Sequence, residues 1–297
     1  GLACMFTMMN SARLYVGVQG LGVAEAATQK ALAYAKDRRQ GRSRDGGEGM
    51  VPIIQHPDVR RMLMTMKALT AAARAICYSC AFAIDMSHAE DGAEATRWAD
   101  RASLLTPMAK SFSTDIGVEV ASIGIQVHGG MGFIEETGAA RLLRDARIAP
   151  IYEGTNGIQA MDLVMRKLPL AGGEAVDALL AEIEADIDAV ETANRPGIAP
   201  MAEGLREALD DLRDAAAFLR QAGVDDALAG ATAYQRLFSL VLGGSLMARA
   251  ALRAEEGTGH DALARFMVAD ILPETGGLKR KVKATGRALE SVDAALA

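Results

Sequence analysis

Hydrophobic residues recur at three- and four-residue intervals along most of the chain, which is the spacing of one face of a helix. The pattern predicts a first long helix over residues 1 to about 36 and a charged, glycine-rich loop over 40–49. A second helix is expected to begin at Pro57, because proline is tolerated in a first turn. A third helix is expected to open within 103–107, and a fourth to end near Leu168. Four amphipathic helices joined by modest loops predict an up-and-down four-helix bundle.

Three glycines, Gly17, Gly20 and Gly22, interrupt the first predicted helix. Glycine lowers helix stability, so its repeated use here indicates close packing of the backbone against a neighbour. We therefore expect another helix of the bundle to approach the first one at this level.

A domain boundary is predicted at 169–173, where proline and two glycines follow the fourth helix. Four further helical stripes lie beyond it. We predict an all-α fold with a bundle over 1–170 and a second helical domain over 171–297. The scarcity of aromatic residues, 4% of the chain, agrees with this fold class, since large sheets favour aromatic and β-branched residues.

Charge and cysteine content restrict the function classes. The net charge of -6 does not suggest nucleic-acid binding, which favours a basic face. We find no apolar run long enough to cross a bilayer, so no transmembrane segment is expected. Three cysteines do not make a disulfide framework, which predicts a cytoplasmic location. Cys77 and Cys80 form a C-x-x-C pair, but no second pair completes a zinc site, so packing on a helix is the preferred interpretation.

Most candidate chemistry lies in residues 126–159. Two glycine clusters flank three arginines and a tightly placed carboxylate, Glu153, which precedes the fourth helix. Glycines let backbone N–H groups approach a ligand, and arginines bind phosphate, so a phosphate-bearing ligand beside a carboxylate base is one interpretation. The other is an ordinary turn between helices with Thr155 or Asn156 as its N-cap, and spacing alone favours this second interpretation.

Three stretches resemble motifs of the acyl-CoA dehydrogenase family. Residues 151–156 (Ile-Tyr-Glu-Gly-Thr-Asn), preceded by 144–148 (Arg-Asp-Ala-Arg-Ile), resemble its active-site motif. Residues 126–132 (Gln-Val-His-Gly-Gly-Met-Gly) resemble its flavin-contacting turn, and 34–40 (Tyr-Ala-Lys-Asp-Arg-Arg-Gln) its third motif. The motifs occur in the family's order over residues 1–168. The resemblance implies that the bundle is the family's C-terminal helical domain.

The resemblance implies roles for residues near the active-site motif. Glu153 is similar to the catalytic base, and Thr155 to a cofactor contact just after it. Asn10 and Arg13 align with positions near the CoA moiety.

Other residues are similar to contacts with the flavin dinucleotide. Arg38 and Gln40 resemble contacts to the FAD of a neighbouring subunit. Gln126, Gly129 and Gly130 resemble the turn around its diphosphate. A flavin site shared between chains implies a homo-oligomer, at least a dimer.

The implied reaction is α,β-dehydrogenation of an acyl-CoA thioester. Glu153 would remove the α-proton while FAD accepts the β-hydrogen as hydride, and electron-transfer flavoprotein would then receive the electrons. Gly41 and Gly157 depart from many members of the family, which have Phe and Gln there. These departures and the long C-terminal part resemble a subgroup of larger enzymes that includes 3-methylmercaptopropionyl-CoA dehydrogenases. The expected substrate is that thioester or a fatty acyl-CoA.

Two alternatives stay open on sequence alone. One is an acyl-CoA oxidase, in which oxygen reoxidises the flavin, and the other is a non-catalytic helical interaction module. The family's helical N-terminal domain and β-barrel middle domain have no counterpart in the sequence, so we expect a piece of an enzyme about twice as long that is inactive alone.

Overall fold

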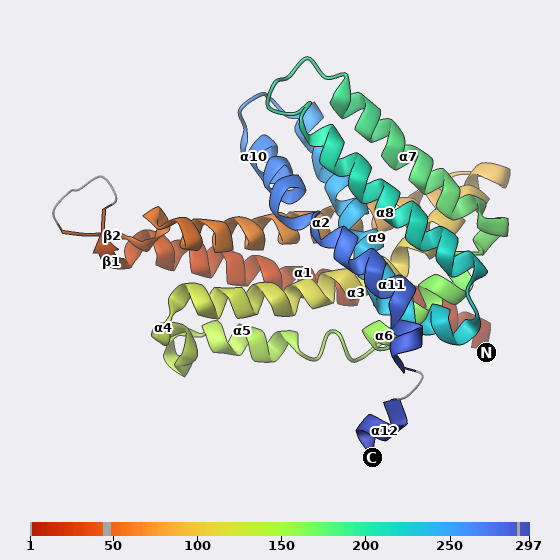
Figure 1. The fold of residues 1–297 in the computed structure, drawn as a ribbon, viewed down its shortest axis with the longest axis horizontal. Helices are drawn as coiled ribbons and strands as arrows, with labels where there is room; N and C mark the ends of the chain where they lie inside the picture. The colour runs from red at the N-terminus through yellow and green to blue at the C-terminus, as the bar shows by residue number, and fades with distance from the viewer. Residues whose placement is uncertain (1, 44–48, 290–291) are drawn as a thin grey trace.

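The computed structural model describes residues 2–43, 49–289 and 292–297, and helices make up most of them (Figure 1). The elements are α1 (Leu2–Asp37), β1 (Arg39–Arg42), β2 (Met50–Pro52), η1 (Ile53–Gln55), α2 (Pro57–Ala89), α3 (Gly92–His128), α4 (Gly130–Phe133), η2 (Glu135–Thr137), α5 (Ala139–Ala146), α6 (Asn156–Asp162), η3 (Leu163–Lys167), η4 (Leu170–Gly173), α7 (Glu174–Glu191), α8 (Met201–Gln221), α9 (Val224–Arg253), α10 (Gly259–Phe266), η5 (Met267–Ile271), α11 (Glu274–Leu289) and α12 (Val292–Leu296). The predicted all-α class is confirmed.

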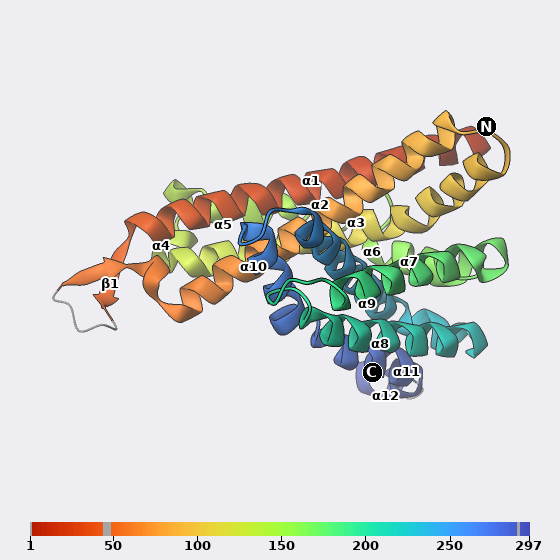
Figure 2. The same ribbon diagram turned by 90° about the horizontal axis from the view of Figure 1, so that it is seen from above.

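Three long helices, α1, α2 and α3, lie side by side along the molecule (Figures 1 and 2). The first two agree with the predicted helices. The predicted loop over 40–49 is partly wrong, because its first residues belong to β1, which pairs antiparallel with β2 just after the loop. The middle of that loop, 44–48, lies outside the described residues.

The prediction that the third helix opens within 103–107 is wrong. α3 begins at Gly92, and Pro107 lies inside it. Proline removes one helical hydrogen bond and ends many isolated helices. Here Leu104, Leu105 and Met108 around it are fully or almost fully buried in the common core. Tertiary packing therefore stabilises the helix across this position.

The fourth side of the bundle consists of two short helices. The predicted fourth helix, which ends near Leu168, corresponds to α6 with η3, whereas α5 was not predicted. α5 and α6 both pack against α3, and the irregular segment 147–155 joins them (Figure 1). Pro150 and Gly154, whose φ is 83°, account for the interruption, because neither favours a helix interior. The turn η3 continues α6 to near the predicted end at Leu168. The interruption separates Glu153 from regular structure.

The expected close packing of the first helix is confirmed at two of its three glycines. A Cβ at Gly17 would lie 2.5 Å from the carbonyl oxygen of Ala109, and one at Gly20 would lie 2.6 Å from that of Ser113. α1 and α3 therefore cross in backbone contact at this level. The expectation is wrong for Gly22, where an added Cβ would meet nothing within 4 Å.

The C-terminal helices cover one side of the long helices, with α9 in contact with both groups (Figure 2). A Cβ at Gly243 of α9 would lie 2.8 Å from the Cβ of Ala72 in α2, so the two helices approach closely. Buried side chains form one core that continues from α1 to α11. The chain turns at 171–173 through three residues with positive φ. The division into domains over 1–170 and 171–297 stays a prediction.

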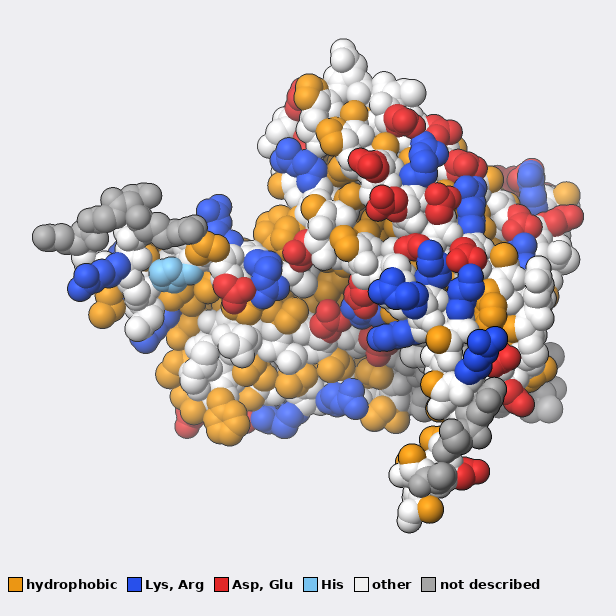
Figure 3. Space-filling view, viewed as in Figure 1, with side chains coloured by type: hydrophobic (Ala, Val, Ile, Leu, Met, Phe, Trp, Pro, Cys, Tyr) orange, Lys and Arg blue, Asp and Glu red, His pale blue; other side chains and the backbone are white. Residues whose placement is uncertain are grey.

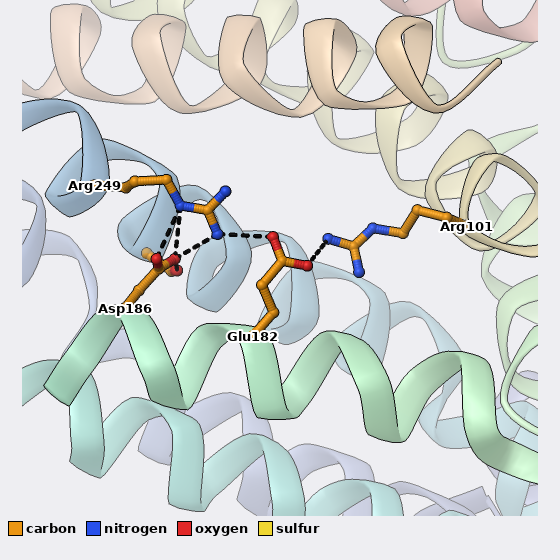
Figure 4. A network of polar contacts seen from close by, with 5 residues as sticks. Arg101, Glu182, Asp186 and Arg249 are labelled. Carbon is orange, nitrogen blue, oxygen red and sulfur yellow. Dashed lines mark hydrogen bonds and ion pairs between the residues drawn. The ribbon is translucent and has the colours of Figure 1, made fainter. Parts of the chain in front are cut away.

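An ion-pair network joins α7 to both groups of helices (Figure 4). Glu182 accepts hydrogen bonds from Arg101 of α3 at 2.6 Å and from Arg249 of α9 at 2.8 Å. Asp186, one turn further along α7, pairs with the same Arg249 at 2.7 Å and accepts from Ser245 at 2.6 Å. Since Arg101 belongs to the bundle, the network fixes α7 against it.

One described helix, α2, has the length and apolar composition needed to cross a membrane, which the search for apolar runs did not find. Its residues Met66, Leu69 and Ile76 are almost fully buried against neighbouring helices of this chain. Core packing therefore accounts for its apolar composition.

Candidate active site

Glu153 lies on the segment between α5 and α6 in a backbone conformation that L-residues rarely adopt. Its φ is 55°, and Gly154 follows at 83°. Among the described residues, the other non-glycine with positive φ is Ala171. A left-handed residue of this kind costs on the order of 1 kcal/mol, so the surroundings must stabilise the turn. One such contact is the hydrogen bond from the Tyr152 hydroxyl to the Gln19 side chain in α1.

The helix after Glu153 begins at one of the two N-cap candidates that the sequence offered. α6 starts at Asn156, and Thr155 is its N-cap, with its hydroxyl accepting from the N–H of Ile158 at 3.3 Å. Glu153 therefore precedes the cap by two residues. In the part of the chain that the structure describes, its own backbone N–H donates to no other group.

The side chain of Asn156 joins this turn to α3. Its Nδ2 donates to Oδ1 of Asp115 at 2.7 Å and to the carbonyl of Ser111 at 3.2 Å. Its Oδ1 accepts from Nζ of Lys110 at 2.8 Å. Its backbone N–H donates to the carbonyl of Pro150 at 3.0 Å, which closes the loop around Glu153. One asparagine thus connects both ends of the loop to the bundle.

Lys110 is an unusual residue for the interior of α3, because it is 0% exposed. Burial lowers the pKa of its ammonium group to about 8, and the nearby carboxylates of Asp115 and Glu153 act in the opposite direction. At neutral pH the buried group is therefore largely charged, with its hydrogen bond directed to Asn156.

The structure brings Arg13, a predicted CoA contact, to the same turn. A Cβ on Gly154 would lie 3.9 Å from Nη2 of Arg13 and 2.7 Å from Nε2 of Gln159. Glycine is therefore required at 154 by space as well as by φ. The side chain of Asn10, the other predicted CoA contact, lies outside the described residues.

The remaining predicted cofactor residues meet at the other end of α1. Arg38, Gln40, Gln126, Gly129 and Gly130 lie around a hollow of about 420 Å³. Nη2 of Arg38 donates to Oε1 of Gln40 at 3.2 Å. An added Cβ on either glycine would meet nothing within 4 Å, so the backbone is open to a ligand.

A stacked pair lines this hollow. The rings of Tyr34 and His128 lie 4.4 Å apart, and Nδ1 of His128 lies 2.6 Å from the carbonyl of Gly124. Burial lowers the pKa of His128, so its imidazole is neutral at pH 7. The histidine therefore packs the end of α3 and supports the turn at Gly129.

Gly41, a departure from the family's pattern, has a local explanation. Its φ is 74°, and an added Cβ would lie 3.0 Å from the ring of His56. Nε2 of His56 in turn lies 2.6 Å from the carbonyl of Gln40. Histidine occupies the space beside β1 that a larger side chain at 41 would need.

The Glu153 turn and the hollow lie far apart on one chain. Arg13 and Asp37 are 24 positions apart on one continuous helix, which corresponds to about 36 Å at 1.5 Å per residue. Thr155, although predicted as a cofactor contact, lies with Glu153 and not at the hollow.

The C-x-x-C pair faces α3 and is buried. Burial raises the pKa of Cys77 to about 11 and that of Cys80 to about 12. Sγ of Cys77 lies 3.2 Å from the Ser113 hydroxyl, and Sγ of Cys80 lies 3.7 Å from that of Thr106. Packing on a helix, the preferred interpretation of this pair, is confirmed.

Comparison with known proteins assigns the family. Residues 1–168 match the family model described as the acyl-CoA dehydrogenase C-terminal domain. The chain belongs to the acyl-CoA dehydrogenase family. Residues 179–293 match a second model, described as acetyl-CoA dehydrogenase C-terminal like. Both parts of the chain thus resemble C-terminal regions of acyl-CoA dehydrogenases.

Individual relatives extend this result. The 3-methylmercaptopropionyl-CoA dehydrogenase of Ruegeria pomeroyi is 56% identical over 176 residues, which are 58% of this chain and 30% of that protein. A butyryl-CoA dehydrogenase of Syntrophomonas wolfei is 34% identical over 302 residues, covering 95% of this chain and 49% of that protein. An acyl-CoA dehydrogenase complexed with FAD from Bacillus anthracis has the same fold, with a TM-score of 0.70 at 20% identity over 97% of this chain and 50% of its own. The chain spans half or less of the length of each.

Sequence reasoning missed the polar group beneath the acyl-CoA dehydrogenase motif, Lys110 and Asp115 above all. The hydrophobic pattern gave no signal for Lys110, because this residue is two positions from both Met108 and Phe112 and lies off the apolar stripe that they mark. A lone lysine at a core position requires a buried partner. The partner could not be identified, since Asn156 follows 46 residues later.

Proposed function

We propose that this chain is the helical catalytic part of an FAD-dependent acyl-CoA dehydrogenase, with Glu153 as the base that removes the α-proton. The relative matched over nearly the whole chain is about twice as long, so the activity belongs to an enzyme that also contains the remaining parts. The 56% identical relative supports 3-methylmercaptopropionyl-CoA as the first substrate to test, followed by fatty acyl-CoA thioesters.

The geometry of the Glu153 turn carries this proposal. A half-buried carboxylate lies at a strained turn, and the backbone N–H of the same residue is available to a ligand. That N–H can donate to a thioester carbonyl, which makes the α-proton more acidic while the carboxylate removes it. Arg13 beside Gly154 supplies a positive charge of the kind that binds CoA phosphates.

Apolar side chains near Glu153 support an acyl ligand. Ile151 precedes the base by two residues, and Ile158, Met161 and Met165 follow at helical spacing. All four are exposed in this chain, between 39% and 52%. Such surface fits the apolar wall of an acyl pocket or of a neighbouring domain.

The hollow at the end of α1 fits part of a flavin dinucleotide. Arg38 presents a guanidinium suited to phosphate, and the backbone at Gly129 and Gly130 is open to close approach. When bound, FAD supplies the acceptor for the β-hydrogen. The distance of this hollow from Glu153 supports the idea that the two serve different flavins in a homo-oligomer.

An exposed apolar edge beside this hollow supports such an oligomer. Figure 3 shows apolar side chains along the edge formed by α4 and α5, whereas both signs of charge cover the face around α8 and α11. Met131, Phe133 and Ile134 belong to that edge, with Phe133 83% exposed. An apolar edge next to a cofactor hollow is a candidate surface for a second subunit.

The first test is anaerobic flavin bleaching by acyl-CoA thioesters in the complete, FAD-loaded enzyme. The native enzyme should bleach, and Glu153→Gln should slow bleaching at least about 100-fold because the general base is lost. Flavin content and thermal stability serve as controls. A variant that bleaches as fast as the native enzyme would disprove the role of Glu153, and a native enzyme that binds FAD without bleaching would support the interaction module.

The electron acceptor needs a separate test. We propose electron-transfer flavoprotein and a cytoplasmic location, which the free buried thiols of Cys77 and Cys80 support. After reduction by substrate, the flavin should reoxidise rapidly with electron-transfer flavoprotein and slowly with dissolved oxygen. Rapid reoxidation by oxygen alone would instead identify an acyl-CoA oxidase.

A further inference from the structure

The loop around Glu153 is stabilised from below by charged and polar groups that no motif contains. Lys110 and Asp115 both lie on α3, and both bond to the side chain of Asn156. Asn156 also closes the loop through its backbone bond to Pro150. Because Glu153 has a strained φ of 55°, the loop requires such contacts to keep its conformation.

The position of Lys110 depends on the close crossing of α1 and α3. An added Cβ on Gly17 would lie 3.3 Å from the backbone nitrogen of Lys110, so α1 covers this part of α3 directly. The lysine is buried there and cannot extend to solvent. A buried ammonium group is stable only with compensating partners, and here the amide oxygen of Asn156 accepts its hydrogen bond. Release of the loop would therefore leave a buried charge without this bond.

We infer that Lys110 and Asn156 form a positioning pair that fixes Glu153 in its reactive conformation. The inference rests on the proposed role of Glu153 as base. Among the described residues, Lys110 donates its hydrogen bond to Asn156 and not to Glu153, so we assign its effect on the base to Asn156. Its effect should therefore appear in the rate of proton removal and not in the affinity for acyl-CoA, because a displacement of about 1 Å can cost about 100-fold in rate.

The test compares Lys110→Met with Lys167→Met in the FAD-loaded enzyme. Lys167 is a matched control, because burial also lowers the pKa of its ammonium group, yet it donates at 2.8 Å to Ser103 and not to the loop. Lys110→Met should slow flavin bleaching about 10- to 100-fold, with the apparent Kd for acyl-CoA changed less than about 3-fold. Lys167→Met should change neither by more than about 3-fold. Equal rate losses in the two variants would overturn the inference.

Asn156→Ala removes the acceptor of the same hydrogen bond, whereas Lys110→Met removes its donor. If the two residues act together, the double variant Lys110→Met/Asn156→Ala should be no slower than the slower single variant, whereas independent effects would multiply. Multiplied effects would overturn the inference. If Lys110→Met does not fold, Asn156→Ala alone decides, since an unchanged bleaching rate contradicts the positioning role.

Hydrogen exchange separates this inference from the proposed function, because it needs no turnover. The amide of Asn156, which bonds to Pro150, should exchange at least about 10-fold faster in Lys110→Met than in Lys167→Met. Unchanged exchange would overturn the positioning pair even in an active dehydrogenase. If exchange is faster in Lys110→Met but no acyl-CoA thioester bleaches the flavin of the native enzyme, the positioning pair is supported and the dehydrogenase function is contradicted.

Discussion

At the scale of single residues, backbone conformation distinguishes Glu153 from the other carboxylates. Thirty-eight acidic residues are spread along the chain, and composition cannot rank them. Glu153 has a left-handed φ, and among the described residues its backbone N–H donates to no other group. The motif singled out the residue, and the structure distinguishes it by its backbone conformation.

The helix glycines provide a residue-scale prediction with its own control. Gly20→Ala should lower stability by about 1–3 kcal/mol, because the added Cβ would lie 2.6 Å from the backbone of α3. Gly22→Ala should instead raise stability by about 0.5–1 kcal/mol, since nothing lies within 4 Å and alanine favours a helix. Thermal unfolding of both variants measures the difference. A destabilised Gly22→Ala, or a neutral Gly20→Ala, would contradict the described crossing.

At the scale of helices, the attachment of α7 depends on ion pairs whose partners are far apart in sequence. Glu182 lies between Arg101 and Arg249, as Figure 4 shows. Burial raises the pKa of Glu182, but the two guanidinium groups outweigh it and the net shift is downward. Helical periodicity predicted α7 correctly, yet it gave no information on which helix α7 would contact.

Glu182→Gln should weaken this attachment. We expect a loss on the order of 1 kcal/mol, because the carboxylate is partly exposed and solvent screens the pairs. Glu184→Gln on the same helix is the control, since Glu184 pairs with Arg213 of α8 and not with the bundle. The measurement is thermal unfolding, and equal shifts for the two variants would show that the bridge to α3 contributes nothing.

Acid should reduce the same contribution. The folded pKa of Glu182 lies below its unfolded value near 4.5, so its stabilisation is present above pH 4.5 and is lost as pH falls through the lower folded value. The stability gap between native protein and Glu182→Gln should therefore narrow below about pH 4. A gap that widens on acidification would contradict the downward shift.

At the scale of the whole molecule, the separation of the two candidate sites predicts how chains cooperate. Arg38 follows the end of α1, about 36 Å along that helix from Arg13 beside the Glu153 loop. If the hollow at Arg38 contacts a partner's flavin, each complete site combines Glu153 of one chain with Arg38 of another. In a dimer of one Glu153→Gln chain and one Arg38→Ala chain, both substitutions would then fall in the same site. The other site would contain both native residues.

Subunit mixing tests this arrangement. Glu153→Gln and Arg38→Ala enzymes should each bleach poorly, the second because its flavin content falls. Co-expressed and purified as a mixed dimer by two affinity tags, they should regain about one native site per dimer, because one site contains both native residues. If both residues served one chain's flavin, the mixed dimer would contain no native site and no activity would return.

The sequence by itself determined most of the helices, and its motifs singled out Glu153 as the candidate base. Helical periodicity is a local property, so it located α1, α2 and α7, and contiguous motifs located Glu153, Arg38 and Gly129. The sequence alone did not determine the start of α3, the presence of α5 or the pairing of Lys110 with Asn156. Each of these depends on contacts between segments that are distant in the chain, because burial decides whether a proline interrupts a helix and whether a lysine stays in a core.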